Sequence, residues 1–181
     1  MRDIIIIAVI VIILIIICSI YLTNLLNQAL IKIDEASSGI DIALTKRYDV
    51  LTKMMDVVRS YAKHEKDTLF AVINLRNNMS MNEKNEENKK MDENFSKINA
   101  IAEAYPELKS SENYKELQQS IIDVEEHLQA ARRLYNSNVS KYNQLLVSFP
   151  TSIIASSRGM IKRDFFEADP VKREDVKINL D

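Results

Sequence analysis

Glycine and proline are scarce in this chain of 181 residues, which has two glycines and three prolines. Average usage would be about 7% glycine and about 5% proline. No glycine occurs between Ile40 and Arg158, and no proline occurs before Pro106. Sheet proteins need many tight turns, and tight turns use glycine, proline and asparagine. These absences argue against sandwiches, barrels, doubly wound folds and glycine-rich phosphate loops, and they favour a chain of few, long helices.

The cysteine and charge contents exclude further classes. The only cysteine, Cys18, lies in an apolar run, so neither an intrachain disulfide nor a cysteine-based metal site can form. The formal net charge is −2, from 24 Lys and Arg against 26 Asp and Glu. Nucleic-acid binding needs a basic excess that neutralises the phosphate backbone, so we expect no nucleic-acid partner.

Motifs of known catalytic sites are also missing. The residues three positions before His64 and His127 are Tyr61 and Val124, so the Glu-x-x-His pairs of di-iron bundles do not occur. His64-Glu65 does not continue into the H-E-x-x-H pattern, and there is no G-x-S-x-G. We therefore expect no enzyme activity, metal, cofactor or small-molecule substrate, and an enzyme of unrecognised type is the least favoured alternative.

The strongest positive signal is the uncharged run Ile4–Leu22, which has 19 residues, eleven of them isoleucine. As a helix it spans roughly 28 Å, close to the hydrocarbon thickness of a bilayer. It exceeds the usual apolar region of a signal peptide, and Tyr21–Leu26 offers no small-x-small cleavage site. We expect an uncleaved single-pass anchor, with a signal peptide or a buried core helix as alternatives. Because Arg2, Asp3 and Lys32 leave the flanking charges nearly balanced, the orientation stays open.

The next segment predicts a long helix followed by a connection. Apolar residues recur in steps of four and three from Leu26 to Val72, which predicts one helix over about residues 26–76, with Ser37–Gly39 as the expected place for a kink. Residues 77–94 contain six asparagines and eight charged residues but no large aliphatic stripe. We interpret them as a solvated connection or frayed helix ends, with a continuous charged helix as the alternative.

Two prolines mark later helix ends. Pro106 should end a short helix, because the residue before proline is biased out of the helical region. Ser110–Asn113 supplies N-cap candidates for the next helix, whose apolar stripe covers residues 117–149 and stops at Pro150. The partly apolar residues 151–166 are expected to contain a short packing helix.

Together these patterns predict an all-α protein with an N-terminal transmembrane helix followed by an elongated antiparallel bundle of three to four helices. The expected organisation is an anchor over residues 1–22, a helical bundle over residues 23–168 and a polar tail over residues 169–181. A two-stripe coiled coil is the alternative architecture, although bulky tyrosines would occupy its seam.

Several polar clusters on the predicted helices are candidate interaction or structural motifs. Lys46–Asp49 suggests local charge pairing on one helix, and Tyr61–Glu65 suggests either a partly buried helix surface or a polar recognition patch. The arginines at 132 and 133 could cross to Asp41, Asp49 or Glu65 in a structural network. The candidates are Arg47, Tyr48, Asp49, Tyr61, His64, Glu65, Tyr105, Pro106, Arg132, Arg133, Tyr135 and Asn136.

A set of short stretches follows a recognisable order and spacing over about residues 22–168. They are Asp34–Ala36, Ile40–Ile42, Lys46–Leu51, Tyr61–Glu65, Ala102–Lys109, Ala130–Asn136, Tyr142–Asn143, Phe149–Pro150 and Phe165–Ala168. Through them the chain resembles the LemA family of bacterial membrane proteins, and scattered polar residues agree as well as the helical stripes.

The resemblance implies an N-terminal membrane anchor, an antiparallel helical bundle and no established enzyme activity. It also implies a domain on the cytoplasmic side of the cell membrane, and a likeness to a protein of magnetosome membrane formation. The chain departs from the family pattern at Ser37, where a tryptophan is usual, and at Thr52-Lys53, where Pro-Asn is usual.

Two functions are favoured over an enzyme activity. The first is a membrane-anchored helical scaffold that binds a protein partner or forms a homo-oligomer. The second is a lipid-acting module at the membrane surface, because the apolar segment Ile153–Phe166 also carries Arg158, Lys162 and Arg163.

Overall fold

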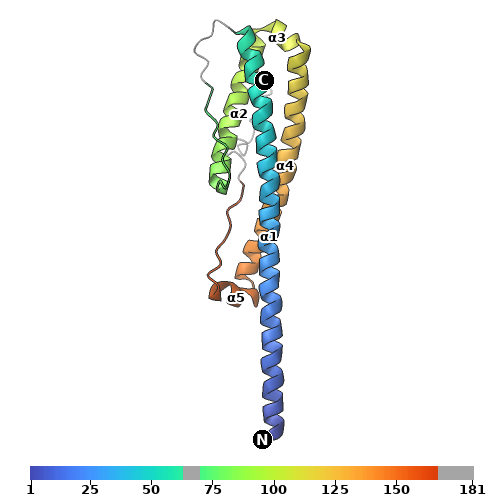
Figure 1. Ribbon diagram of the computed structural model, residues 1–181, viewed down its shortest axis with the longest axis vertical. Coiled ribbons are helices and arrows are strands. Elements are labelled where there is room, and N and C mark those ends of the chain that lie inside the picture. Colours follow the sequence, from blue (N-terminus) through green and yellow to red (C-terminus); the bar gives the residue numbers. More distant parts are fainter. Residues whose placement is uncertain (63–69, 167–181) are drawn as a thin grey trace, which may run out of the picture. The chain divides into compact units, whose positions relative to one another are not determined.

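The computed structural model describes residues 1–62 and 70–166, and these residues form five helices (Figure 1). The helices are α1 (Arg2–Tyr61), α2 (Met81–Ala104), α3 (Pro106–Ser110), α4 (Glu112–Val147) and α5 (Thr151–Ser157). No strand occurs within the described ranges. The predicted all-α class, with a long apolar helix at the N-terminus and packed helices after it, is confirmed.

The chain divides into two compact units. Unit 1 consists of Met1–Ser38 and Arg133–Asp164, and unit 2 consists of Gly39–Arg132 and Phe165–Asp181. Helices α1 and α4 contribute residues to both units.

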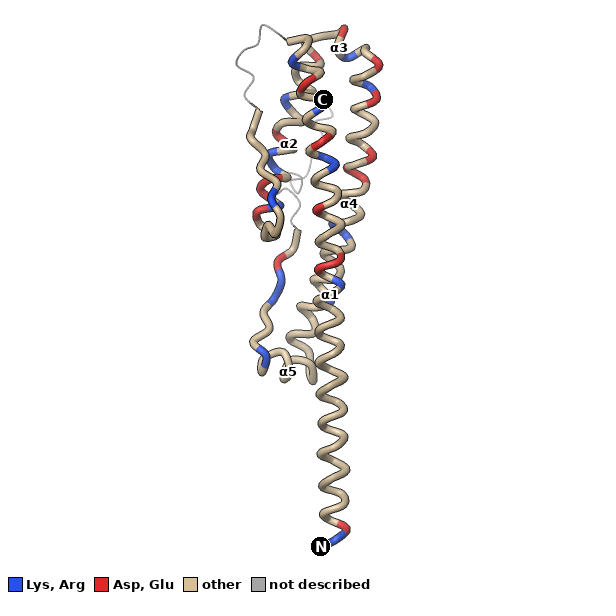
Figure 2. The backbone as a smooth tube through the Cα atoms, in the orientation of Figure 1, with Lys and Arg blue, Asp and Glu red and all other residues tan. Residues whose placement is uncertain are grey.

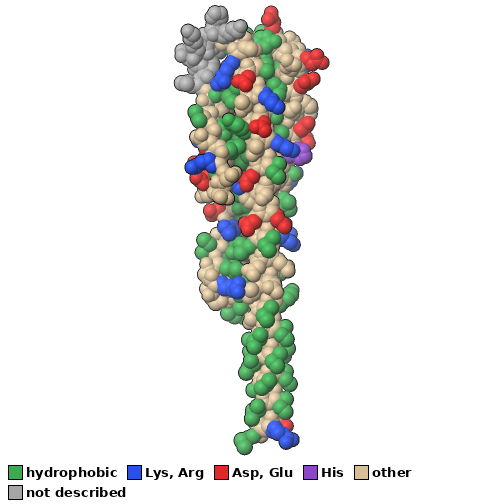
Figure 3. Space-filling model, in the orientation of Figure 1, with side chains coloured by type: hydrophobic (Ala, Val, Ile, Leu, Met, Phe, Trp, Pro, Cys, Tyr) green, Lys and Arg blue, Asp and Glu red, His purple; other side chains and the backbone are tan. Residues whose placement is uncertain are grey.

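Unit 1 contains the apolar run of α1. The only charges in the first part of α1 are at its N-terminal end, at Arg2 and Asp3 (Figure 2), and hydrophobic side chains cover the run beyond them (Figure 3). The large apolar side chains from Ile4 to Ile20 are 48–71% exposed, whereas Leu26 is completely buried. Within the described residues, α1 is the one helix that is long and apolar enough to cross a membrane, by length and composition.

Two side chains of α4 hold the segment after α5, residues 158–164, which we call the strap. The side-chain oxygen of Asn143 accepts a hydrogen bond from the Arg163 N–H, and its amide group donates to the Arg163 carbonyl, both at 2.9 Å. The Tyr135 hydroxyl donates to the Asp164 carbonyl at 3.0 Å. These bonds fix the strap to the C-terminal half of α4 within unit 1.

Helix α5 ends in a glycine C-cap. The N–H of Gly159 donates to the Ser156 carbonyl and the N–H of Met160 donates to the Ala155 carbonyl, which is the Schellman pattern. Gly159 has φ +62°, a left-handed conformation that glycine adopts without steric cost. The expected short packing helix therefore exists, but it stops at Ser157 and the strap follows.

In unit 2, α1 and α2 run in the same direction and α4 runs in the opposite one (Figure 1). Asp41 pairs with Lys84, and Arg47 pairs with Asp92, so positions ascend together along α1 and α2. Their shared core includes the buried residues Ile40, Leu44, Leu51, Met54, Met91, Ile98, Leu108, Tyr114, Ile121 and Leu128.

The prolines act as predicted. Helix α2 ends at Ala104, and Pro106 occupies the first turn of α3. Ser111 precedes α4, and its hydroxyl accepts a hydrogen bond from the Tyr114 N–H at 3.4 Å. Helix α4 ends at Val147, before Pro150.

The first long helix is shorter than predicted. It ends at Tyr61 rather than near residue 76, and residues 70–76 are not helical. Val72, the last member of the apolar series, is 73% exposed. Helix α1 also continues through Ser37–Gly39, the expected kink, without a break.

The preferred interpretation of residues 77–94 was wrong from Met81 onward, because these residues open the helix α2. Four of its polar side chains are buried, and all four contact another segment of the chain. They are Lys84, Glu87, Asn88 and Asn94. A helix whose buried face consists of paired polar groups lacks the aliphatic stripe on which the prediction relied.

Candidate functional site

The site lies in unit 2, where an extended segment, residues 70–79, packs along α2. The N–H of Ala71 donates to the Asn94 side-chain oxygen at 2.7 Å, and the Asn94 amide donates to the Ala71 carbonyl at 2.9 Å. The N–H of Asn74 donates to a carboxylate oxygen of Glu87 at 2.7 Å. Because an unpaired buried backbone group is costly, these side chains let an extended chain pack on a helix without a sheet partner.

Electrostatics support the same contact. Burial raises the pKa of Glu87, but hydrogen bonds from Lys90 and from the Asn74 N–H outweigh it and hold the pKa below its ordinary value. Lys90 is 2.7 Å from the Glu87 carboxylate. The Glu87 carboxylate therefore accepts hydrogen bonds both from the extended segment and from its own helix, α2.

A turn reverses the chain between the extended segment and α2. Asn78 has φ +62°, a conformation that asparagine tolerates better than most residues. Ser80 and Glu83 then form a capping box, in which the Ser80 hydroxyl accepts from the Glu83 N–H and the Glu83 carboxylate accepts from the Ser80 N–H. The hydrogen bonds that the Glu83 carboxylate accepts from the Ser80 N–H and from the Ser80 hydroxyl lower the pKa of Glu83.

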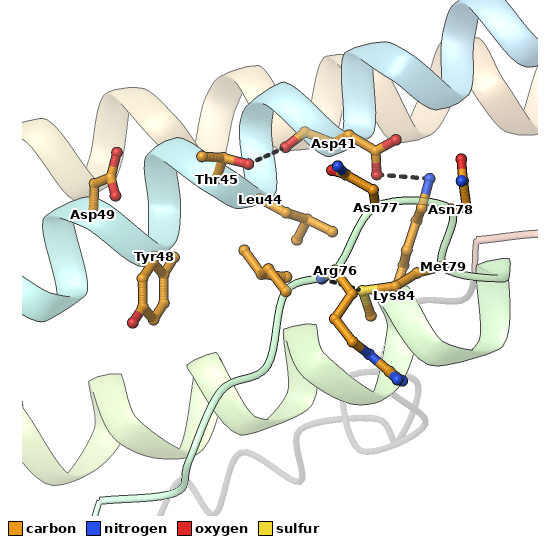
Figure 4. A pocket seen from close by; sticks show the side chains of 11 residues that line it. Asp41, Leu44, Thr45, Tyr48, Asp49, Arg76, Asn77, Asn78, Met79 and Lys84 are labelled. Carbon is orange, nitrogen blue, oxygen red and sulfur yellow. Dashed lines mark hydrogen bonds and ion pairs between the residues drawn. The ribbon is translucent and has the colours of Figure 1, made fainter.

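An open pocket of about 620 Å³ lies between α1, the turn and the start of α2 (Figure 4). Its lining includes Asp41, Tyr48 and Asp49 of α1 and Asn77 and Asn78 of the turn. Most of these side chains are polar, so the pocket is suited to contacts with polar groups.

Lys84 lines the pocket on the α2 side. Its side chain extends toward α1, where the ammonium group is 2.6 Å from the Asp41 carboxylate (Figure 4). Lys84 is 5% exposed, whereas the Asp41 side chain is 55% exposed. A buried ammonium group needs such a partner, so this ion pair fixes the pocket wall.

Beside the pocket, Arg47 is the centre of a buried charge cluster. It is 2% exposed, and its guanidinium contacts Asp92 of α2 and Glu125 of α4, each at 2.5 Å. It also donates to the Asn88 side-chain oxygen at 2.6 Å. Hydrogen bonds to α2 and an ion pair to α4 thus join three helices at one residue, so Arg47 is a structural centre of unit 2.

Arg132 completes the cluster from α4. Its guanidinium lies 4.8 Å from the centre of the Phe166 ring, within the range of a cation–π contact. Burial lowers the Arg132 pKa and the neighbouring Arg47 adds to this, while Asp92 and Glu125 oppose it. The guanidinium remains charged, because arginine titrates far above neutral pH.

The candidate residues fall into different places. Arg47 pairs across helices, with Asp92 and Glu125, rather than locally. Asp41, one of the acids expected to pair with the arginines at 132 and 133, pairs with Lys84. Tyr48 and Asp49 line the pocket. Arg132 contacts Phe166, while Arg133 is exposed in unit 1.

Among the described residues, none of the remaining candidates is part of the pocket lining. Tyr61 is exposed at the last residue of α1, and Tyr105 and Pro106 form the junction of α2 and α3. Tyr135 holds the strap, and Asn136 is partly buried in unit 1. His64 and Glu65 lie outside the described residues.

The sequence interpretation missed Lys84, Asn88, Asp92 and Asn94. A usable signal existed, because the apolar positions Met91 and Ile98 continue backward at helical spacing through Lys84 and Asn88. The Ser80-x-x-Glu83 pattern also marks a helix start. Lys84 and Asn88 are polar, so a stripe defined by aliphatic residues alone does not include them.

Comparison with known proteins relates this chain to one family. The sequence pattern of the LemA family matches residues 36–180. Protein LemA of Metamycoplasma hominis is 29% identical over 150 residues, which cover 80% of this chain and 68% of that protein.

Magnetosome proteins are further relatives. Magnetosome protein MamQ of Magnetospirillum gryphiswaldense is 27% identical over 74 residues, which cover 41% of this chain and 27% of that protein. Magnetosome protein MamQ 1 of Paramagnetospirillum magneticum matches to the same extent. None of these names states an enzymatic function, and together with the apolar helix they indicate a membrane location in bacteria.

Proposed function

Because the chain belongs to the LemA family, we propose that it is a non-enzymatic scaffold anchored in the bacterial cell membrane by residues 4–22. In this proposal it binds a protein partner or a second copy of itself through unit 2. One observation carries the proposal: α1 passes without a break from an exposed apolar run into packed helices. A span of this kind has its backbone hydrogen bonds satisfied inside the helix, as a bilayer requires.

The proposed organisation is an anchor over residues 1–22, a helical bundle over residues 23–168 and a polar tail over residues 169–181. Described packing begins at the end of the anchor, since Leu22 is 9% exposed and Leu26 is completely buried. The tail lies outside the described residues.

Anchoring is tested by placing charge in the run. In the full chain, Ile10→Arg with Ile13→Arg should release the protein from membranes in alkaline carbonate, because each central arginine costs about 2.5–3.5 kcal/mol in a spanning helix. The matched control is Ile42→Arg with Ile122→Arg, at isoleucines exposed in unit 2. Retention of both double variants in the membrane pellet would rule out insertion of this run.

We further propose that the packed helices face the cytoplasm. In a Cys18→Ser background, a cysteine replacing Ser157 should react with an impermeant maleimide only after the cells are opened, whereas a cysteine replacing Asp3 should react in intact cells. The reverse labelling pattern would refute this orientation.

The pocket of unit 2 is the surface we assign to the protein partner. Its polar, open lining favours a hydrated contact over an apolar docking site. A photoreactive residue in place of Thr45, on the pocket rim, should give one discrete crosslinked species in cells at native expression. The same residue in place of the exposed Glu116 is the control, and equal, diffuse crosslinking from both positions would contradict the assignment. A species of twice the chain mass would identify a homo-oligomer.

A lipid-acting role in remodelling is the second candidate function. It is supported by apolar side chains that are exposed at the end of unit 1, with Phe149 82% and Ile161 76% exposed. Vesicles carrying the reconstituted full chain should then change in size or curvature relative to vesicles carrying the same amount of an Ile161→Asn variant. Identical vesicles would remove this candidate.

A further inference from the structure

Unit 1 carries a surface that combines exposed apolar and basic side chains. Phe149, Ile153 and Ile161 are 82%, 59% and 76% exposed. Arg158, Lys162 and Arg163, on the same stretch of chain, are also exposed. We call these six residues the interfacial patch. Large apolar side chains left in water on a folded unit mark a surface that something else covers.

The backbone that carries the patch is held in place. Asn143 binds both the N–H and the carbonyl of Arg163, and Thr151 donates to the carbonyls of Leu145 and Ser148 at the end of α4. The glycine C-cap fixes the exit from α5. The exposed apolar groups therefore belong to an ordered surface, and they are not a consequence of local unfolding.

The patch lies at the end of the unit where the apolar run emerges. Within unit 1, α5 lies at the height along α1 at which burial in α1 begins (Figure 1). Burial in α1 begins at Leu22, which is also the last residue of the apolar run. A bilayer that holds the run would thus have its headgroup layer next to α5.

We propose that the interfacial patch docks onto the anionic headgroup layer of the same bilayer that holds α1. This inference rests on the anchoring proposed above and deepens it by naming the residues and the lipid charge. The apolar side chains enter the boundary between headgroups and acyl chains, and the three basic side chains pair with lipid phosphates. Asp164, the one nearby acidic side chain of the strap, leaves this segment with a positive balance.

The test uses the full chain in proteoliposomes. An environment-sensitive fluorophore is placed on a cysteine replacing Ser157 in a Cys18→Ser background, and quenching by spin-labelled lipids is measured. We expect strong quenching in phosphatidylglycerol-containing vesicles and weak quenching in pure phosphatidylcholine. Neutralising the patch with Arg158→Gln, Lys162→Gln and Arg163→Gln should weaken docking about fivefold per charge. These substitutions keep the backbone bonds of Arg163.

The matched control neutralises three exposed lysines of unit 2, at Lys89, Lys109 and Lys115, and it should leave the quenching unchanged. A second label, on a cysteine replacing Ser96 in α2, should stay unquenched. Quenching that is equal in both lipids and unaffected by the patch variant would overturn the proposal. Shielding that rises with protein density instead of anionic lipid would assign the patch to a second copy and overturn it too.

Failure of anchoring is distinguished in the same samples. Carbonate extraction tests the insertion of α1 alone. A protein that stays in the membrane pellet but shows no lipid quenching at position 157 would therefore refute the docking of the interfacial patch and leave the anchoring proposal in place.

Discussion

Helix α2 and the end of unit 1 are opposites in composition and in burial. The start of α2 is rich in asparagine and charge, yet Asn94 is completely buried and Lys84 is 5% exposed. The segment around α5 is partly apolar, yet its large apolar residues Phe149 and Ile161 are exposed. Burial therefore follows the availability of partners. The polar groups of α2 are buried where other groups satisfy them, and under the docking proposed above a bilayer would receive the exposed apolar groups.

The largest test of this comparison is Arg47→Met. It removes the cation between Asp92 and Glu125, so two partly buried carboxylates lose their partner and the free energy of unfolding should fall by about 3 kcal/mol. Chemical denaturation of the full chain in detergent, followed by circular dichroism, measures it. The exposed neighbour Lys46→Met should change the free energy by less than about 0.5 kcal/mol. An equally small effect at Arg47 would mean that the cluster is not stabilising.

A second test removes the side chain that replaces a sheet partner. Asn94→Ala loses both hydrogen bonds to Ala71 and leaves the N–H and carbonyl of Ala71 unpaired. We expect the free energy of unfolding to fall by about 2 kcal/mol. Hydrogen exchange at the Ala71 amide should accelerate in the same variant. Asn82→Ala, an exposed asparagine of α2, serves as the control. Unchanged exchange at Ala71 would show that Asn94 does not hold the extended segment.

The two glycines give a third test with opposite signs. Gly159→Ala places a side chain at φ +62° and should destabilise by about 1 kcal/mol, although no atom lies within 4 Å of the added carbon. Gly39→Ala should stabilise by about 0.5–1 kcal/mol, because Gly39 is inside α1 and its new carbon would meet Ala131 at 3.9 Å. Denaturation midpoints compare the two. A destabilising Gly39→Ala would indicate a tighter helix contact than the structure shows.

The smallest test is the pH dependence of Glu87. Its pKa is lowered in the folded state, so its contribution to stability is fully present above its ordinary pKa of 4.5 and is lost as pH falls through the folded value. Denaturation midpoints of the wild type should decline below about pH 4.5, and Glu87→Gln should decline less. Glu86→Gln, at an exposed position, should follow the wild type. Parallel curves for all three proteins would exclude a role for Glu87.

The sequence predicted the fold well where a single physical signal dominates. The uncharged isoleucine run, the stripe over residues 117–149 and the two proline stops all matched the described helices. It failed at residues 70–94, where the helix break after Tyr61 and the helix α2 depend on each other. Asn94 and Glu87 are buried in α2, and both accept hydrogen bonds from the backbone of the extended segment.

The candidate site was predicted only in part. Tyr48 and Asp49 line the pocket, and Arg47 is central, but its partners Asn88, Asp92 and Glu125 were not anticipated. Partners on other helices depend on how the helices pack, and a one-dimensional pattern of charges favours the local i,i+3 pairing instead.

The contact points between the extended segment and α2 have the same spacing on both segments. Ala71 and Asn74 are three residues apart in an extended chain, which spans about 10 Å. Their partners Asn94 and Glu87 are seven residues apart, which is two helical turns and about 10.5 Å. These two distances are nearly equal, so the pairs Ala71–Asn94 and Asn74–Glu87 can form together in only one register of the extended segment along α2. One inserted residue between Ala71 and Asn74 would offset the segment by about 3.3 Å and break one anchor whenever the other forms.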